Sequence, residues 1–162
     1  MKKQVKKQGT YPVQEEANLN VVNEPVAEYN SSYERAMTDS FAMMEEVRRG
    51  VTKSKLLQLA EKMDISVAEL ADILHISLRT IQRYDENDRL DPHISEHIML
   101  LDRLYRKGQT DSIFRTPQGF NNWMKREQFG FNFNIPIKLI DTYSGIEAVH
   151  GKLIQFEHGI FA

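Results

Sequence analysis

Three residues near the middle of the chain have the types and spacing of a zinc-protease motif. His93, Glu96 and His97 form the pattern H-x-x-E-H in a stretch that predicts a helix, which would place both imidazoles on one helical face. A zinc hydrolase would need a third protein ligand, for which Glu147 and Glu157 are the downstream candidates. Because short motifs recur by chance, a solvated helix surface is the favoured interpretation, and a zinc hydrolase is kept only as the enzymatic alternative.

Other sequence motifs of enzyme active sites are absent from the sequence. The chain has no cysteine, which excludes disulfides, thiolate nucleophiles and cysteine metal sites. It also lacks a phosphate-binding glycine loop, a dinucleotide fingerprint and a serine nucleophile elbow. The sequence therefore predicts a protein that is not an enzyme, with no cofactor and no metal site.

A second group of polar residues has the chemistry of DNA recognition. In the major groove, arginine can form two hydrogen bonds with guanine and glutamine two with adenine, while hydroxyl groups can hold phosphates. The candidate DNA-binding residues are Ser77, Arg79, Thr80, Gln82 and Arg83. The alternative is an ordinary helical hairpin with a solvated polar face, because the charges of the segment 77–90 cancel.

The helical period divides this segment into two arcs. At 100° per residue, one arc is expected to pack against the protein, and it contains Leu78, Ile81, Tyr84 and Asp85. The other is expected to face outward, and it contains Arg79, Gln82, Arg83 and Glu86. The outward arc therefore holds three of the five candidate DNA-binding residues.

Two capping signals place this segment in a helix-turn-helix over residues 66–89. Ser66 and Glu69 have capping-box spacing at the start of one short helix, and Ser77 can cap the next. Ala71 is small where the second helix must approach closely. The short connection between the two helices matches that of the DNA-binding motif.

The surrounding segments also read as helices, with no strand-type alternation. Apolar residues predict one helix over residues 32–49 with Tyr33, Met37, Phe41, Met44 and Val47 on its packed stripe, and another over residues 52–62. Three further helices are expected from Asp91–Pro92 to Gly108, from Thr116–Pro117 onward, and from Ser144 with Glu147 as a capping box, and a short turn is expected at Ile135–Pro136. The fold class is all-α.

Length, composition and net charge limit the classes of fold and of partner that are possible. With 162 residues and 41% hydrophobic side chains, the chain can bury a core, and its net charge of −2 restricts any nucleic-acid contact to a local patch. The first residues are lysine-rich and polar, so residues 1–31 are expected to be a disordered arm, either a solubilising tail or a DNA contact. Neither a signal peptide nor a membrane span is expected, and the absence of cysteine favours the cytoplasm.

The chain also resembles a known family, the Xre/MbcA/ParS-type antitoxins that partner RES-domain toxins. In the helix-turn-helix half, the resemblance rests on Arg49–Val51, Ile65–Ser66, Glu69–Ala71, Ile76–Ser77, Arg79–Thr80 and Gln82–Arg83. In the second half, it rests on Phe114, Trp123, Pro136, Leu139, Thr142, Gly145, Val149, Leu153 and Glu157–Ile160. The chain departs from the family between Trp123 and Pro136, where Phe129, Phe131 and Phe133 make the loop more aromatic, so contacts to a toxin are expected to differ there.

This resemblance implies an antitoxin of a type II toxin-antitoxin system. Such a protein represses its own operon through operator DNA, forms a homodimer within a larger complex, and neutralises a toxin that consumes NAD by covering the active site. It implies a helical domain over residues 32–108 and a toxin-binding and dimerisation domain over residues 109–162. The toxin-binding residues would be Phe156, Glu157, His158, Gly159, Ile160, Phe161 and Ala162. The alternative is a solitary helix-turn-helix transcription regulator without a toxin partner.

Overall fold

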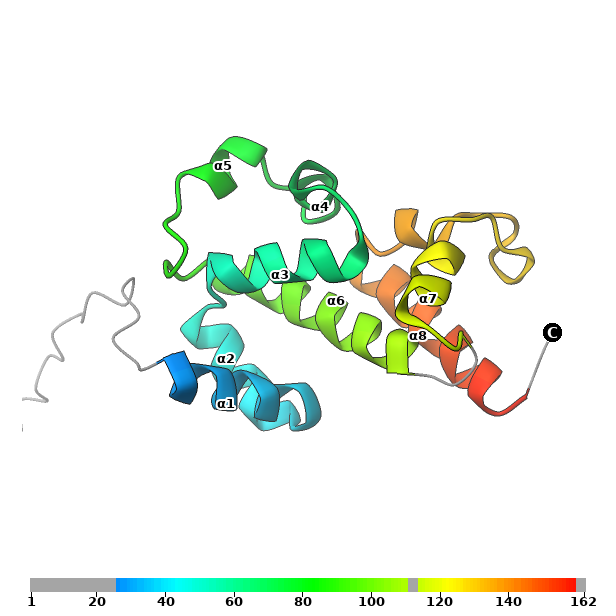
Figure 1. The fold of residues 1–162 in the computed structure, drawn as a ribbon, viewed down its shortest axis with the longest axis horizontal. Coiled ribbons are helices and arrows are strands. Elements are labelled where there is room, and N and C mark those ends of the chain that lie inside the picture. The colour runs from blue at the N-terminus through cyan, green and yellow to red at the C-terminus, as the bar shows by residue number, and fades with distance from the viewer. Residues whose placement is uncertain (1–25, 111–113, 160–162) are drawn as a thin grey trace, which may run out of the picture.

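The computed structural model describes residues 26–110 and 114–159, and it describes the side chains from Asn30 onward. Most of the expected N-terminal arm, including its lysines, and the candidate toxin-binding residues Ile160, Phe161 and Ala162 lie outside the described residues. Within the described ranges the chain forms eight α-helices and two short 3-10 helices (Figure 1). These ranges contain no strand, only two isolated β-bridges, so the expected all-α class is confirmed.

The first part of the chain folds into five helices before the long central one. Their bounds are α1 (Val26–Thr38), α2 (Ser40–Arg49), α3 (Lys53–Met63), α4 (Val67–Ile73) and α5 (Leu78–Gln82). Helices α4 and α5 lie on one side of α3, and α1 and α2 lie on the opposite side (Figure 1). The short helix α5 and its turn are therefore at an outer face of the molecule.

The second part follows the central helix α6 (Pro92–Thr110). It contains α7 (Pro117–Met124), the 3-10 helices η1 (Phe129–Phe131) and η2 (Pro136–Lys138), and α8 (Tyr143–Glu157). Helix α6 packs against α2 and α3 and also against α7 and α8. Its buried residues Ile98, Leu101, Leu104 and Tyr105 form the middle of the core.

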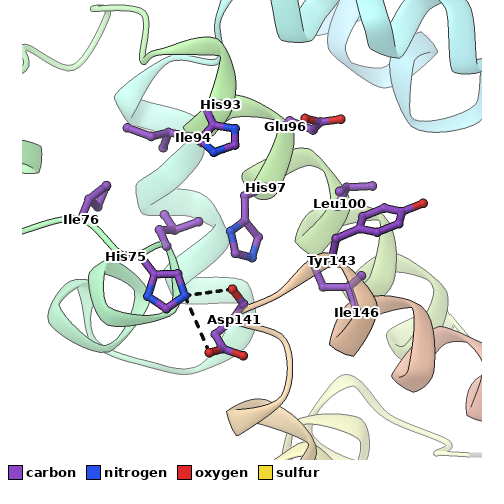
Figure 2. A pocket seen from close by; sticks show the side chains of 11 residues that line it. His75, Ile76, His93, Ile94, Glu96, His97, Leu100, Asp141, Tyr143 and Ile146 are labelled. Carbon is purple, nitrogen blue, oxygen red and sulfur yellow. Dashed lines mark hydrogen bonds and ion pairs between the residues drawn. The ribbon is translucent and has the colours of Figure 1, made fainter.

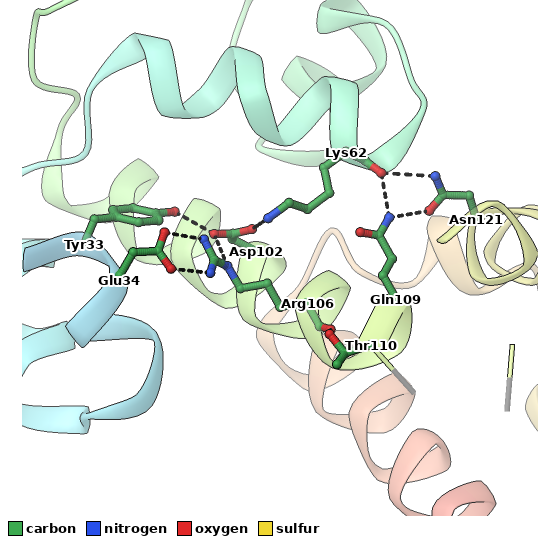
Figure 3. A network of polar contacts seen from close by, with 8 residues as sticks. All are labelled: Tyr33, Glu34, Lys62, Asp102, Arg106, Gln109, Thr110 and Asn121. Carbon is green, nitrogen blue, oxygen red and sulfur yellow. Dashed lines mark hydrogen bonds and ion pairs between the residues drawn. The ribbon is translucent and has the colours of Figure 1, made fainter. Parts of the chain in front are cut away.

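A polar network fastens α1 and α3 to α6 (Figure 3). The carboxylate of Asp102, only 4% exposed, accepts hydrogen bonds from the Tyr33 hydroxyl at 3.1 Å and from Arg106 Nε at 3.0 Å, and it also pairs with Lys62. Arg106 forms a two-pronged ion pair with Glu34, with distances of 2.6 and 2.9 Å. A buried carboxylate is tolerated when it is paired and hydrogen-bonded in this way.

The expected single helix over residues 32–49 is wrong, because the chain breaks at Asp39. This residue has an extended backbone, and its carboxylate accepts hydrogen bonds from the amides of Phe41 and Ala42 as the N-cap of α2. The break changes the phase of the apolar stripe. Phe41 and Met44, expected to pack, are 76% and 45% exposed, while the buried positions of α2 are Ala42, Met43 and Glu46.

Two expected helix boundaries are also wrong. Gly108 does not end α6, which continues to Thr110, because Gly108 is a buried position beneath the ring of Phe120. Helix α8 is capped by Thr142, whose hydroxyl accepts from the amide of Gly145 at 3.2 Å, and not by Ser144. Glu147 instead accepts a hydrogen bond from the hydroxyl of Tyr143 at 3.0 Å.

Candidate nucleic-acid interface

The helix-turn-helix is formed by α4, a short turn and α5. Its first helix begins with a complete capping box: the amide of Glu69 donates to Ser66 Oγ at 3.1 Å, and the amide of Ser66 donates to the Glu69 carboxylate at 2.8 Å. The hydrogen bonds that the amide and the hydroxyl of Ser66 donate to the Glu69 carboxylate lower the pKa of Glu69. Its second helix begins at Ser77, whose hydroxyl accepts from the amide of Thr80 at 3.0 Å. Both start sites are those that the sequence predicts.

A small apolar core sets the angle between the two helices. Leu70, Ala71 and Leu74 of the first half are buried against Ile81 of α5. The segment after α5 then returns to the start of α3, where Lys53 Nζ donates to the carbonyl oxygen of Tyr84 at 2.6 Å. The orientation of α5 is therefore fixed at both of its ends.

The candidate DNA-binding residues lie along α5 and at its two caps, Ser77 before it and Arg83 after it. Arg79, Gln82 and Arg83 are exposed, and neither arginine has a carboxylate partner among the described residues. Both guanidinium groups can therefore approach a phosphate or a base edge without first breaking an ion pair. Arginines on an exposed face without such partners are suited to DNA contact.

Ser77 and Thr80 are less available for phosphate binding than the sequence suggests. Their hydroxyl oxygens lie 2.8 Å apart, so one hydroxyl hydrogen is used within the pair and one remains for an external acceptor. Thr80 is half-buried, whereas Ser77 is exposed. The two residues can therefore offer one shared hydrogen-bond donor.

Two residues of the expected packed arc face solvent instead. Ile81 is 2% exposed and Tyr84 is half-buried, but Leu78 is 39% exposed and Asp85 is exposed. Because α5 has only five residues and ends at Gln82, its packed face holds a single fully buried side chain. The exposed Leu78 provides an apolar group next to the candidate arginines.

The turn between the two helices is attached to the second part of the chain, a contact that no sequence pattern indicates. His75 has a left-handed backbone with φ of 54°, and its ring Nε2 donates to the carbonyl oxygen of Asp141 at 3.1 Å (Figure 2). The same nitrogen lies 3.7 Å from the Asp141 carboxylate. The turn of the helix-turn-helix is thus joined to the segment that leads into α8.

The H-x-x-E-H residues are not arranged as a metal site. His93 is exposed, and His97 Nε2 donates to the carbonyl oxygen of Ile140 at 2.9 Å. In the described parts of the chain, no group of three histidine, cysteine, aspartate or glutamate residues is placed to hold a metal ion. The motif instead contributes a contact between α6 and the segment before α8.

The second candidate site, at the end of α8, packs on an aromatic cluster. The ring of Phe156 lies 5.8 Å from that of Trp123, which also contacts Phe114, Phe120 and Phe131. Trp123 is therefore a packing residue. The sequence does not indicate that Phe129 and Phe133 are 76% and 62% exposed beside this cluster, with their rings 5.7 Å apart.

The described part of the candidate toxin-binding segment, residues 156–159, forms the end of α8. Lys107 Nζ pairs with the Glu157 carboxylate at 2.6 Å, which lowers the pKa of that carboxyl group. His158 is exposed, and Gly159 has a φ of 71°, which turns the chain out of the helix. Helix α8 therefore ends at His158 and Gly159.

Comparison with known proteins supports the interpretation of the first part of the chain. Residues 42–101 match the family model described as the antitoxin Xre-like helix-turn-helix domain. The matched segment runs from α2 into α6 and contains both helices of the motif. No curated protein matches the chain. Within the described ranges, none of the helices combines the length and the apolar character needed to cross a membrane.

Proposed function

We propose that this protein is the antitoxin of a type II toxin-antitoxin pair, which binds operator DNA and represses its own operon. The observation that carries the proposal is the exposed outer face of α5, inside the segment that matches the antitoxin-type domain. On this face Arg79, Gln82 and Arg83 read bases or phosphates, and the pair Ser77 and Thr80 supplies one further donor. The role is regulatory and not enzymatic.

We also propose that the second part of the chain neutralises a RES-type toxin that consumes NAD. In this proposal residues 156–162 cover the toxin's active site, and residues 109–162 form the toxin-binding and dimerisation domain. Support comes from the packed position of Phe156, the ion pair of Glu157 and the left-handed backbone of Gly159, which fix the end of α8 from which this segment continues. The protein acts as a homodimer in the cytoplasm, within a larger complex with the toxin.

DNA binding is tested with the Arg79→Ala and Arg83→Ala variants and DNA from upstream of the reading frame. Fluorescence anisotropy at several salt concentrations should show weaker binding, and each lost phosphate contact should lower the salt-dependence slope by about 0.9. Arg48→Ala and Arg126→Ala are matched controls, because both arginines are exposed and lie outside the segment 77–83. If the α5 variants and the controls bind equally well, the proposed role of α5 is wrong.

Toxin neutralisation is tested by co-expression with the neighbouring reading frame. The full chain should form a stable complex and relieve toxicity, and a chain shortened by Ile160–Ala162 should inhibit NAD consumption less while its thermal unfolding is unchanged. A shortened chain that inhibits as well as the full one would contradict the role of the tail. A chain that represses transcription but rescues no toxicity would instead be a solitary regulator.

A further inference from the structure

A continuous groove runs between the N-terminal halves of α6 and α8. Its larger part is a cavity of about 550 Å³ that reaches the turn of the helix-turn-helix, and a smaller part of about 190 Å³ continues along α6. Three residues line both parts and make them one groove: Leu100, Tyr143 and Ile146. Figure 2 shows the side chains that line the larger part, which come from α6, from the turn and from the start of α8.

The floor of the groove is apolar. Leu104 and Ile146 are 1% and 5% exposed, and Ile94 and Leu100 are half-buried beside them. Tyr143 stands over this floor and is 59% exposed. An exposed aromatic ring over an apolar floor is typical of a surface that binds another protein.

The rim of the groove is acidic. Glu96, Asp141 and Glu147 line it, and Glu96 has no hydrogen-bond or ion-pair partner among the described residues. The hydrogen bond from the Tyr143 hydroxyl to Glu147, together with the charges of Glu147 and Glu96, raises the pKa of Tyr143. Arg103 also lines the groove and donates to the carbonyl oxygen of Ala36 on α1 at 3.2 Å. Four histidines line it as well, His75, His93, His97 and His150, and two of them are hydrogen-bonded to backbone, His75 to Asp141 and His97 to Ile140.

The dimensions of the groove suit a helix. The stretch of α6 that lines it, from His93 to Leu104, covers about 16 Å at a rise of 1.5 Å per residue. This length corresponds to about three turns of an α-helix laid alongside. A helix in such a groove is held by apolar residues spaced at i, i+3, i+4 and i+7.

We propose that the groove between α6 and α8 is a docking surface for a cationic amphipathic helix of a partner protein. Apolar side chains of the bound helix cover Leu100, Tyr143 and Ile146, and its lysines or arginines face Glu96 and Glu147. Charge complementarity selects the cationic helix, because an acidic helix would meet the same rim with repulsion. The inference goes beyond the proposed DNA and toxin roles, although one wall of the groove belongs to residues 109–162, the proposed toxin-binding and dimerisation domain.

The test uses the full chain and a fluorescent peptide of about fifteen residues, with leucines on one helical face and lysines on the other. A matched peptide carries glutamates in place of the lysines. Anisotropy should show binding of the lysine peptide that is at least about tenfold tighter than binding of the glutamate peptide. Equal binding of both peptides would overturn the proposal.

Variants locate the bound peptide. The double variant Glu96→Gln with Glu147→Gln should weaken binding by about tenfold or more, and Tyr143→Ala should weaken it similarly. The matched control is Glu61→Gln with Glu127→Gln, which makes the same change in net charge at exposed positions away from the groove. If Tyr143→Ala does not fold, the glutamine pair, which keeps the side-chain shapes, decides the test. Equal losses in the groove and control variants would mean nonspecific charge attraction and would contradict the proposal.

Two other occupants would give different results. If the chain's own lysine-rich arm holds the groove, the peptide would bind only after Lys2, Lys3, Lys6 and Lys7 are replaced by glutamine. If a second copy covers the groove, Tyr143→Ala would convert a dimer to a monomer in sedimentation velocity. Either result would overturn the assignment to a partner helix.

Discussion

The imidazole of His75 is hydrogen-bonded to the carbonyl oxygen of Asp141 at 3.1 Å. His75 belongs to the turn between α4 and α5, and Asp141 precedes the cap of α8. One side chain therefore connects the DNA-reading candidate to the helix whose end is the candidate toxin-binding segment. The residue makes this contact from a left-handed backbone that costs a non-glycine residue free energy.

The first prediction compares two substitutions of His75. Both His75→Gly and His75→Ala remove the contact with Asp141, but only alanine keeps a Cβ at a φ of 54°. We expect the glycine variant to be more stable than the alanine variant by about 1 kcal/mol, because glycine adopts this backbone without strain. Urea denaturation of the two variants measures the difference. A more stable alanine variant would show that the turn changes its backbone when the imidazole is removed.

The second prediction separates helix capping from DNA contact. Ser66→Ala and Ser77→Ala each remove an N-cap hydrogen bond, so each should lower the free energy of unfolding by about 1 kcal/mol. Only Ser77→Ala should also weaken operator binding, because Ser77 adjoins the arginines of α5. Chemical denaturation and DNA anisotropy on the same two variants check both parts. Equal losses of DNA affinity would assign the effect of Ser77 to stability alone.

The stability of the fold should depend on pH through the ion pair of Glu34 and Arg106. The hydrogen bonds from Arg106 lower the pKa of Glu34 below its ordinary value of 4.5, so the folded state favours the ionised carboxylate. This stabilisation is present above pH 4.5 and is lost as the pH falls through the lowered pKa of the folded state. Because the pair is partly exposed, Glu34→Gln should cost about 0.5–1 kcal/mol at pH 7. The difference from the unmodified chain in urea midpoints should shrink toward pH 3.5, and a constant difference would contradict the ion-pair explanation.

The fourth prediction uses two glycines within helices. A Cβ at position 108 would overlap the ring of Phe120, which is completely buried, so Gly108→Ala should destabilise the fold by about 1–3 kcal/mol. A Cβ at position 151 would meet no atom within 4 Å, so Gly151→Ala should stabilise α8 by up to about 1 kcal/mol. Thermal unfolding of the two variants should therefore show shifts in opposite directions. A tolerated Gly108→Ala would mean that Phe120 is less tightly packed than the structure indicates.

Local signals predict much of this fold. Ser66 with Glu69 and Ser77 mark helix starts through hydrogen bonds within three residues, and Thr116 followed by Pro117 does the same for α7. Predictions from such signals hold in the folded structure because the hydrogen bonds depend on neighbouring residues only. The helix-turn-helix and the arginines beside its second helix can therefore be predicted from the sequence.

The errors arise where distant packing overrides a local signal. Gly108 has the type of a helix stop, but Phe120 needs the space above it, and this contact joins residues on different helices. Asp39 reads as an ordinary polar residue of a long helix, yet the chain must turn there for α2 to reach α6. The contact of His75 with Asp141 joins positions 66 residues apart, a relation that the helical period does not reveal.

The central helix α6 makes the two parts of the chain depend on each other for stability. Because α6 lies against α2 and α3 and also against α7 and α8, it belongs to the core of both parts of the chain. Neither part keeps a complete core if α6 is cut, so the whole body should unfold in one cooperative step. A cellular protease that opens this helix would then remove the proposed DNA-binding surface and the proposed partner-binding surface together, in a single event.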